Sequence, residues 1–298
     1  MKEIVFLGTS SMAPTKERNH PAFLIRYNKE ILLFDCGEGT QRQLKFAKIS
    51  SNKITKIFIS HWHGDHVLGL PGLLQTLAGN NFKGEIQIFG PETTKERIEK
   101  LLEIYPFERE YELKIYEIKK GGLIFENEEF SIYARELEHS VKCFGFEFVE
   151  KDKINLNKDL LKEFGIEEGP HLQKLKKGQN IKVKGKIIRP KDVGYVIKGK
   201  KIGYLADTTV CDNAYRIAKD ADILISEATF DSKLEEKARE RLHLTSKDAA
   251  LIASQSNVKE LILFHFSQRY DDISLLLEQA KEIFSNTIAA YDFMKVKF

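Results

Sequence analysis

The chain has few cysteines and no long apolar run. Its three cysteines, Cys36, Cys143 and Cys211, are scattered among 298 residues and form no CxxC pair. This pattern argues against a disulfide framework and predicts reduced thiols in a cytoplasmic protein. No stretch reaches 18 consecutive apolar residues, so we expect no membrane-spanning helix, and the first residues resemble the start of a strand rather than a signal peptide.

Internal repeats and low-complexity tracts are also missing from the sequence. Apolar residues make up 42% of the chain, which is enough to fill a sizeable core. The length suits one large α/β domain or two small ones. Strand-like blocks alternate with helical ones, which predicts an α/β sandwich of sheets flanked by helices. Within it, we expect Tyr111–Ile118 to pair antiparallel with its neighbours, and 193–198 and 201–205 to form a hairpin.

Histidine is scarce too, at 8 residues, yet three histidines fall within six positions. His61, His63 and His66 share this segment with Asp65. An apolar β-branched run, 56–59, precedes the segment and predicts a buried strand, and 67–78 predicts a helix. The cluster would then lie at the carboxyl end of a strand, where α/β proteins commonly place their sites. Imidazole and carboxylate groups suit zinc, whereas the plain alternative is a loop of surface histidines.

A hydrolytic metal site needs more ligands than one loop supplies. His139, Asp207, Glu227 and His265 each lie at or near the end of a probable strand. One such residue alone is more often structural. Four of them, in a chain that already has the histidine cluster, favour a shared site.

The net charge of +3 is unevenly distributed along the chain. Residues 151–191 hold 12 lysines and arginines against 5 aspartates and glutamates, which leaves the rest of the chain slightly acidic. Within this segment, 174–191 has eight basic residues and no acidic one. A solvated surface loop is the usual explanation of such a run. A basic segment on a slightly acidic body also suits a polyanionic partner.

These residues carry a resemblance to a known family. The loop His-x-His-x-Asp-His at 61–66, with a later His, Asp and His, resembles the metallo-β-lactamase superfamily. Six further blocks across nearly the whole chain are similar to the ribonuclease Z family, the endonucleases that process the 3′ end of tRNA: Phe6 to Ser10, Pro14 to Asn19, Asp35 to Gln41, Ser226 to Phe230, His243 to Thr245, and His265 to Tyr270. The resemblance implies an αββα sandwich with an extruded basic arm, that is, a single domain over 1–298 with an inserted tRNA-binding arm at 151–191.

The resemblance also implies a ligand set and a mechanism. It assigns His61, His63 and His139 to one zinc ion, and Asp65, His66 and His265 to a second. Asp207 would bridge the two ions of each subunit, and Asp65 could also accept a proton from the attacking water. His243 would donate a proton to the leaving group, and Glu227 would orient it.

The expected reaction is removal of the 3′ trailer from precursor tRNA, leaving a 3′-hydroxyl on the tRNA and a 5′-phosphate on the trailer. The length resembles the short form of the family, which implies a homodimer in the cytoplasm. The implied RNA contacts fall in a loop, in the arm and near the C-terminus: Lys16, Arg18, Asn19, Gly169, Pro170, Lys174, Lys176, Lys177 and Arg269.

Three alternatives stay open at this point. Another hydrolase of the superfamily, such as a small-molecule phosphodiesterase or thioesterase, would not need a basic arm. A non-catalytic RNA-binding protein would not need an intact ligand set. A redox di-iron protein is disfavoured, because that branch generally has Glu where this chain has His63.

Overall fold

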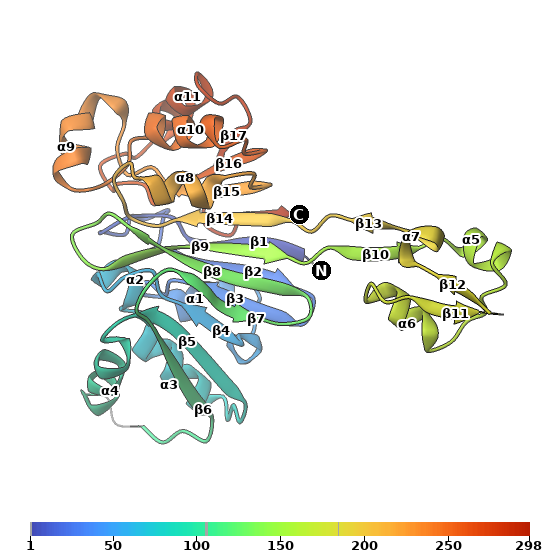
Figure 1. Ribbon diagram of the computed structural model, residues 1–298. Helices are drawn as coiled ribbons and strands as arrows, with labels where there is room; N and C mark the ends of the chain where they lie inside the picture. The colour runs from blue at the N-terminus through green and yellow to red at the C-terminus, as the bar shows by residue number, and fades with distance from the viewer. Residues whose placement is uncertain (1, 105–106, 184) are drawn as a thin grey trace. The chain divides into compact units, whose positions relative to one another are not determined.

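The computed structural model describes residues 2–104, 107–183 and 185–298 (Figure 1). It divides into two compact units. The first comprises residues 1–125, 132–148 and 201–298, and the second comprises 126–131 and 149–200. The segment predicted as an inserted arm, 151–191, lies inside the second unit, which is somewhat longer. None of the described helices has the length and apolar character that a bilayer crossing requires.

The first unit contains two seven-stranded sheets. The first sheet has the order β18-β1-β2-β3-β4-β5-β6, formed by Lys295–Lys297, Lys2–Gly8, Ala22–Tyr27, Glu30–Phe34, Lys56–Phe58, Glu85–Pro91 and Glu112–Ile118. Strands β18, β1, β2 and β3 pair antiparallel, and β3 to β6 pair parallel.

The second sheet has the order β17-β16-β15-β14-β9-β8-β7. Its strands are Thr287–Ala289, Glu260–Phe264, Ile223–Glu227, Lys201–Leu205, Cys143–Glu150, Phe130–Leu137 and Gly122–Glu126. Strands β14 to β17 are parallel, so their carboxyl ends meet at one edge of the sheet. Two sheets flanked by helices confirm the predicted sandwich.

Side-chain alternation explains why the first sheet is buried on both faces. Aliphatic residues such as Leu24, Leu33 and Ile57 belong to one core cluster, which also includes residues of α1 and α3. Several of the intervening residues are aromatic and face the second sheet: the ring of Phe23 lies 4.9 Å from that of Tyr204 on β14. Because successive side chains of a strand point to opposite faces, one alternating sequence fills two different cores.

Helices cover the outer faces of both sheets (Figure 1). On the first sheet, α1 packs on β1, and α4 on β5 and β6; on the second, α8 packs on β14, α10 on β15 and β16, and α11 on β17. Thr245 and Asp248 form a capping box at the start of α10. The helices of this unit are α1 Thr40–Phe46, α2 Gly64–Val67, α3 Leu70–Gly79, α4 Thr94–Ile104, α8 Asp212–Ala218, α9 Glu235–Glu240, α10 Ser246–Gln255 and α11 Ser274–Lys281.

Three local predictions were wrong. Strand β6 pairs parallel with β5 rather than antiparallel. The expected hairpin of 193–198 with 201–205 does not form, because β13 (Gly194–Ile197) pairs with β10 (Lys153–Leu156) while β14 joins the second sheet. The helix expected over 67–78 is two helices, α2 and α3, since the Gly69 amide leaves the helical pattern to donate to the Cys36 carbonyl.

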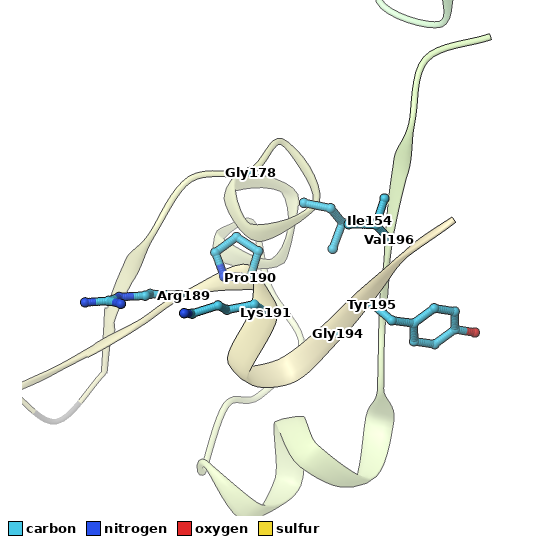
Figure 2. Close-up of a pocket in the computed structure, with 8 residues that line it drawn as sticks. All are labelled: Ile154, Gly178, Arg189, Pro190, Lys191, Gly194, Tyr195 and Val196. Carbon is cyan, nitrogen blue, oxygen red and sulfur yellow. The ribbon is translucent and has the colours of Figure 1, made fainter. Parts of the chain in front are cut away.

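The second unit has its own small apolar core of Leu161, Ile166, Leu175, Ile181, Ile188 and Val193. It has two antiparallel strand pairs, β10 with β13 and the hairpin of β11 (Ile181–Val183) with β12 (Lys186–Ile188). Its helices are α5 Lys158–Glu163, α6 His171–Lys176 and α7 Pro190–Val193. A pocket of about 390 Å³ lies in this unit, with Ile154 and Val196 on one side and Arg189 and Lys191 on another (Figure 2).

Candidate active site

The predicted ligands lie beyond the ends of strands in both sheets of the first unit. His61 and His63 follow β4, and His66 lies on α2. His139 follows β8, Asp207 follows β14, and His265 follows β16. Since these strands end at the same edge of the sandwich, loops far apart in sequence bring their side chains together.

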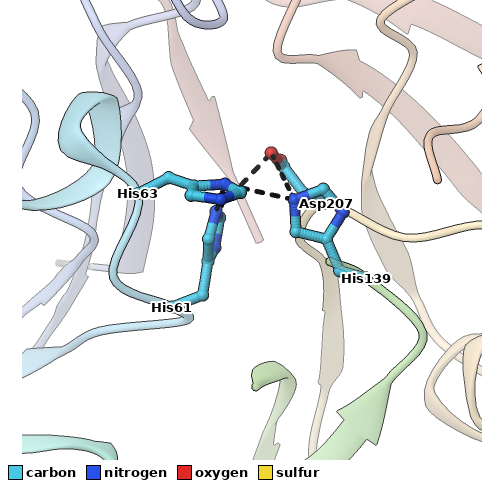
Figure 3. A group of neighbouring side chains, drawn as sticks. All are labelled: His61, His63, His139 and Asp207. Carbon is cyan, nitrogen blue, oxygen red and sulfur yellow. Dashed lines mark hydrogen bonds and ion pairs between the residues drawn. The ribbon is translucent and has the colours of Figure 1, made fainter. Parts of the chain in front are cut away.

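One group consists of His61, His63, His139 and Asp207 (Figure 3). The Nδ1 atom of His63 lies 3.1 Å from Nε2 of His61 and 3.2 Å from Nε2 of His139. The Oδ2 atom of Asp207 lies 3.6 Å from Nε2 of His61 and 3.8 Å from Nε2 of His139. Four potential ligand atoms thus surround one point, which is the number that tetrahedral zinc takes.

The second group consists of Asp65, His66 and His265. The Nε2 atoms of the two histidines are 3.2 Å apart, and Oδ2 of Asp65 lies 3.4 to 3.5 Å from both. The other oxygen of Asp207, Oδ1, faces this group at 3.3 Å from His265 Nε2 and 3.5 Å from His66 Nε2.

Asp207 therefore turns one carboxylate oxygen toward each group. Its Oδ1 atom is buried and accepts no hydrogen bond from the residues that the structure describes. A buried carboxylate oxygen without a donor is costly unless a cation balances it. This oxygen and the converging nitrogens fit the binding of a metal cation beside Asp207.

The outer nitrogens of the histidines are held by hydrogen bonds. His66 Nδ1 donates to Asp35 at 2.8 Å, His139 Nδ1 to the Leu242 carbonyl at 3.0 Å, and His265 Nδ1 to Thr229 Oγ1 at 2.9 Å. Each bond keeps the proton on Nδ1 and leaves Nε2 free to bind a metal. His63 differs, because its Nδ1 faces the group and its Nε2 faces Ser140.

The carboxylates around His66 favour a positive charge at this position. Burial works against protonation of this ring, but the carboxylates of Asp65, Asp207 and Asp35 raise the pKa of His66 well above its usual value. Burial, reinforced by repulsion from His66, lowers the pKa of His61 well below its usual value. Three carboxylates around one buried ring create a negative field that bound cations would neutralise.

His243 and Glu227 form a pair beside the ligands. Nδ1 of His243 donates to Oε1 of Glu227 at 2.9 Å, and Nε2 of His243 lies 4.0 Å from Oδ2 of Asp207. Burial alone would lower the pKa of His243, but the Glu227 and Asp207 carboxylates raise it to about 9. The ring thus carries a proton on each nitrogen at neutral pH and presents its Nε2–H to the ligand groups.

The predicted RNA-binding residues have different environments. Lys16 and Arg269 are exposed, and the Arg269 guanidinium lies over the Phe230 ring at 4.8 Å. Arg18 is buried and donates to the Tyr270 carbonyl. Asn19 donates its side-chain amide to the Glu38 carbonyl at 2.8 Å. Arg18 and Asn19 therefore hold the shape of the loop, whereas Lys16 and Arg269 are accessible to a phosphate.

The predicted arm residues all lie in the second unit, around α6. Lys174, Lys176 and Lys177 are exposed, and Gly169 and Pro170 come just before the helix. Lys177 forms an ion pair with Glu128 at 3.0 Å. The basic side chains are thus available to solvent at the surface of a small packed unit.

Sequence reasoning assigned no role to the residues that support the ligands. Asp35 accepts hydrogen bonds from the Ser60 amide, Ser60 Oγ, His66 Nδ1 and Tyr204 Oη. Thr229 Oγ1 lies between Glu227 and His265, donating to the first at 2.6 Å and accepting from the second. Asp35 and Thr229 do fall within the family-like blocks at 35–41 and 226–230. The sequence therefore marked both residues, but it did not show which histidine each one supports.

Comparisons with known proteins agree over nearly the whole chain. Residues 2–283 match the family model described as Anti-Pycsar protein Apyc1. The chain is 38% identical to the ribonuclease Z of Methanothermobacter thermautotrophicus, with 100% of this chain and 97% of that protein covered. It is 41% identical to the ribonuclease Z of Bacillus cereus, with 97% of each covered.

Solved structures are also similar to this chain over nearly its whole length. Human tRNase Z, short form, is similar with a TM-score of 0.74 at 30% identity, over 99% of this chain and 98% of that one. The metallo-β-lactamase fold protein YhfI from Bacillus subtilis has a TM-score of 0.73 at 18% identity, over 100% and 99% of the two chains. The second likeness shows the fold alone.

Proposed function

Because the chain belongs to the ribonuclease Z family, and also to the family described as Anti-Pycsar protein Apyc1, we propose that it is a metal-dependent endonuclease that removes the 3′ trailer from precursor tRNA. The product tRNA would carry a 3′-hydroxyl and the trailer a 5′-phosphate. Two zinc ions per subunit would occupy the two ligand groups, with Asp207 shared between them.

The arrangement of Asp207 is the observation that carries this proposal. Its two oxygens face two groups of imidazole nitrogens, one of which also includes Asp65. Two ions at such a site, when bound, supply an activated water and neutralise charge on the phosphoryl oxygens. Full-length similarity to ribonuclease Z makes an RNA phosphodiester the best-supported substrate.

Residues of the chain itself would carry out the proton transfers. His243 donates the proton of Nε2 to the departing 3′-oxygen, which is a poor leaving group without it. Glu227 accepts from Nδ1 of the same ring, and so fixes both the ring orientation and the position of that proton. Glu227 is fully buried, and Thr229 Oγ1 and the Thr208 amide each donate to it, which keeps it from moving. Asp65 can accept a proton from the attacking water.

Substrate recognition would use basic residues of the second unit together with basic residues of the first unit. Lys174, Lys176 and Lys177 in the second unit would contact the tRNA backbone, since lysine and phosphate attract without regard to base sequence. Lys16 and Arg269 would contact phosphates nearer the cut. We also propose a cytoplasmic homodimer, on the strength of the resemblance to the short form of the family.

The direct test uses an end-labelled precursor tRNA. Purified protein should cut it at one position next to the discriminator nucleotide, and a chelator should stop the reaction. His63→Ala should abolish cleavage but leave tRNA binding nearly unchanged, because the ligand groups and the basic second unit are different parts of the chain. Full activity of metal-stripped protein would contradict the two-zinc assignment.

A small phosphodiester is the second candidate substrate, because the matching family model does not itself imply RNA. The same preparation should therefore be offered a nitrophenyl phosphodiester and precursor tRNA in parallel. Efficient hydrolysis of the small diester, with no specific cut in tRNA, would favour this second function.

A further inference from the structure

A groove of about 430 Å³ lies beside the ligand groups, and the proposed reaction does not yet use it. It is lined by Leu242, by the last two residues of β8, 136–137, and by residues 138–142, which connect β8 to β9. His139, one of the predicted ligands, is part of its wall. The groove therefore begins at the site itself.

The groove lies on the side of the site where the proton donor is. The Leu242 carbonyl accepts from His139 Nδ1, and the next residue along the chain is His243. The rings of His139 and His243 are 5.1 Å apart. In an in-line displacement the leaving oxygen departs on the side of the acid, opposite to the attacking water. The nucleoside that carries the leaving oxygen must then lie next to these two histidines.

The walls of the groove have the chemistry that a nucleobase needs. Val141 is 39% exposed, and with the partly exposed Leu242 it offers apolar surface for the face of a base. Ser140 is exposed and contributes a hydroxyl for a polar edge, and its Oγ lies 3.5 Å from His63 Nε2. At the rim, Lys142 is paired with Glu136 at 2.7 Å, which keeps two long side chains in place.

Leu242 is held in an unusual backbone conformation. Its φ of 55° lies in the left-handed region, which a leucine rarely adopts. Strain of this kind persists where surrounding contacts over-determine the backbone, and it is frequent at functional sites. Here it allows one residue to hold His139 through its carbonyl while its side chain forms part of the groove.

We propose that this groove binds the nucleobase of the nucleotide whose 3′-oxygen is the leaving group. The inference rests on the proposed endonuclease function and adds a subsite to it. Contact between the base and the apolar wall would place the leaving oxygen within reach of His243.

The test compares two precursor tRNAs that differ at one nucleotide. One has the normal base on the 5′ side of the cut, and the other is abasic there. Stacking of one base on a protein surface is worth enough for roughly a tenfold change in kcat/KM, so wild-type protein should cut the abasic substrate about tenfold more slowly. Val141→Ala should slow cleavage of the normal substrate several-fold and leave the abasic rate as in wild type. Leu251→Ala, at an exposed leucine of α10 outside the groove, is the matched control and should change neither rate.

The outcomes separate the two proposals. If wild-type protein cuts neither tRNA, the endonuclease function is overturned, and the subsite with it. If wild-type protein cuts both substrates equally fast, or if Val141→Ala slows both by the same factor, the subsite alone is overturned. Melting temperatures of the variants, measured in the same buffer, confirm that each rate belongs to folded protein.

Discussion

Replacing Tyr204 with phenylalanine should weaken metal binding through a carboxylate that is not itself a ligand. The Tyr204 hydroxyl donates to Oδ2 of Asp35 at 2.7 Å, from β14 in one sheet to the end of β3 in the other. The same oxygen accepts from His66 Nδ1, and from Ser60 Oγ, which in turn accepts from His61 Nδ1. Asp35 thus orients one histidine in each ligand group.

The size of the effect follows from what the substitution leaves behind. Tyr204 is 2% exposed, so no water replaces its hydroxyl, and Asp35 loses one of three donors to Oδ2. A hydrogen bond to a buried charged group contributes about 1.5–3 kcal/mol. Loss of a partner behind a metal ligand typically lowers metal affinity about 10- to 100-fold. We therefore expect Tyr204→Phe to lower zinc affinity by one to two orders of magnitude.

Tyr111→Phe is the matched control. Tyr111 is also buried, and its hydroxyl donates to the Leu74 carbonyl at 3.0 Å, away from the ligands. Zinc affinity is measured by competition with a chromophoric chelator, and fold stability by denaturation of the metal-free proteins. Both variants should lose some stability, but only Tyr204→Phe should lose affinity. Unchanged zinc binding in Tyr204→Phe, or an equal loss in Tyr111→Phe, would refute the role given to the network.

Other features of the chain lead to three further predictions. His243→Ala should slow tRNA cleavage by about two to four orders of magnitude. Hydrolysis of a nitrophenyl phosphodiester should be nearly unaffected, because that leaving group needs little protonation. Equal slowing with both substrates would mean that His243 has a structural role. Deleting residues 156–189 should remove most of the affinity for tRNA and weaken the salt dependence of binding, measured as Kd at two salt concentrations. Hydrolysis of a small phosphodiester should continue. Unchanged tRNA affinity would mean that the basic segment is only a solvated loop. Burial raises the pKa of Asp292 from 3.8 to about 6, against the hydrogen bonds from Asn19 and Thr9. A folded-state pKa above the unfolded one means that the folded protein holds the proton more tightly, so this group's contribution to stability falls as pH rises from about 4 to 6, by about 3 kcal/mol in all. Denaturation of metal-free Asp292→Asn should show a flatter pH profile over that window, and a profile identical to wild type would contradict this account.

The ligand positions could be predicted because their signal is local. His61, His63, Asp65 and His66 are close together in sequence. Asp207 and His265 each follow an apolar run that forms a strand, and His139 follows an alternating run that also forms one. Since carboxyl ends of neighbouring strands share an edge, strand ends alone indicate which side chains can meet. Pairing these residues into two groups needed the family resemblance, because spacing does not say which histidines face the same oxygen of Asp207.

Features that depend on distant partners could not be predicted. The parallel direction of β6 follows from the crossover through α4, which returns the chain to the same end of the sheet as β5, and the residues of the strand taken alone do not carry this information. Strands β17 and β18 have three residues each, too short for a periodic signal. The guanidinium of Arg18, a predicted RNA contact, donates to a carbonyl 252 positions away in sequence. Burial of a basic residue in this way is visible only once the chain is folded.

The charge of the site explains why binding and catalysis would use different parts of the chain. Asp35, Asp65, Asp207 and Glu227 are all buried near the ligand nitrogens, so the protein groups alone present a negative field. Such a field repels a phosphate until cations occupy the two groups. A site of this kind cannot also supply the long-range attraction that brings in a polyanion. That attraction must come from basic residues elsewhere. Lys174, Lys176 and Lys177 of the second unit are exposed, and residues 174–191 include eight basic residues and no acidic one. The chelator experiment follows from this division: removing the metals should stop cleavage while tRNA still binds through the second unit.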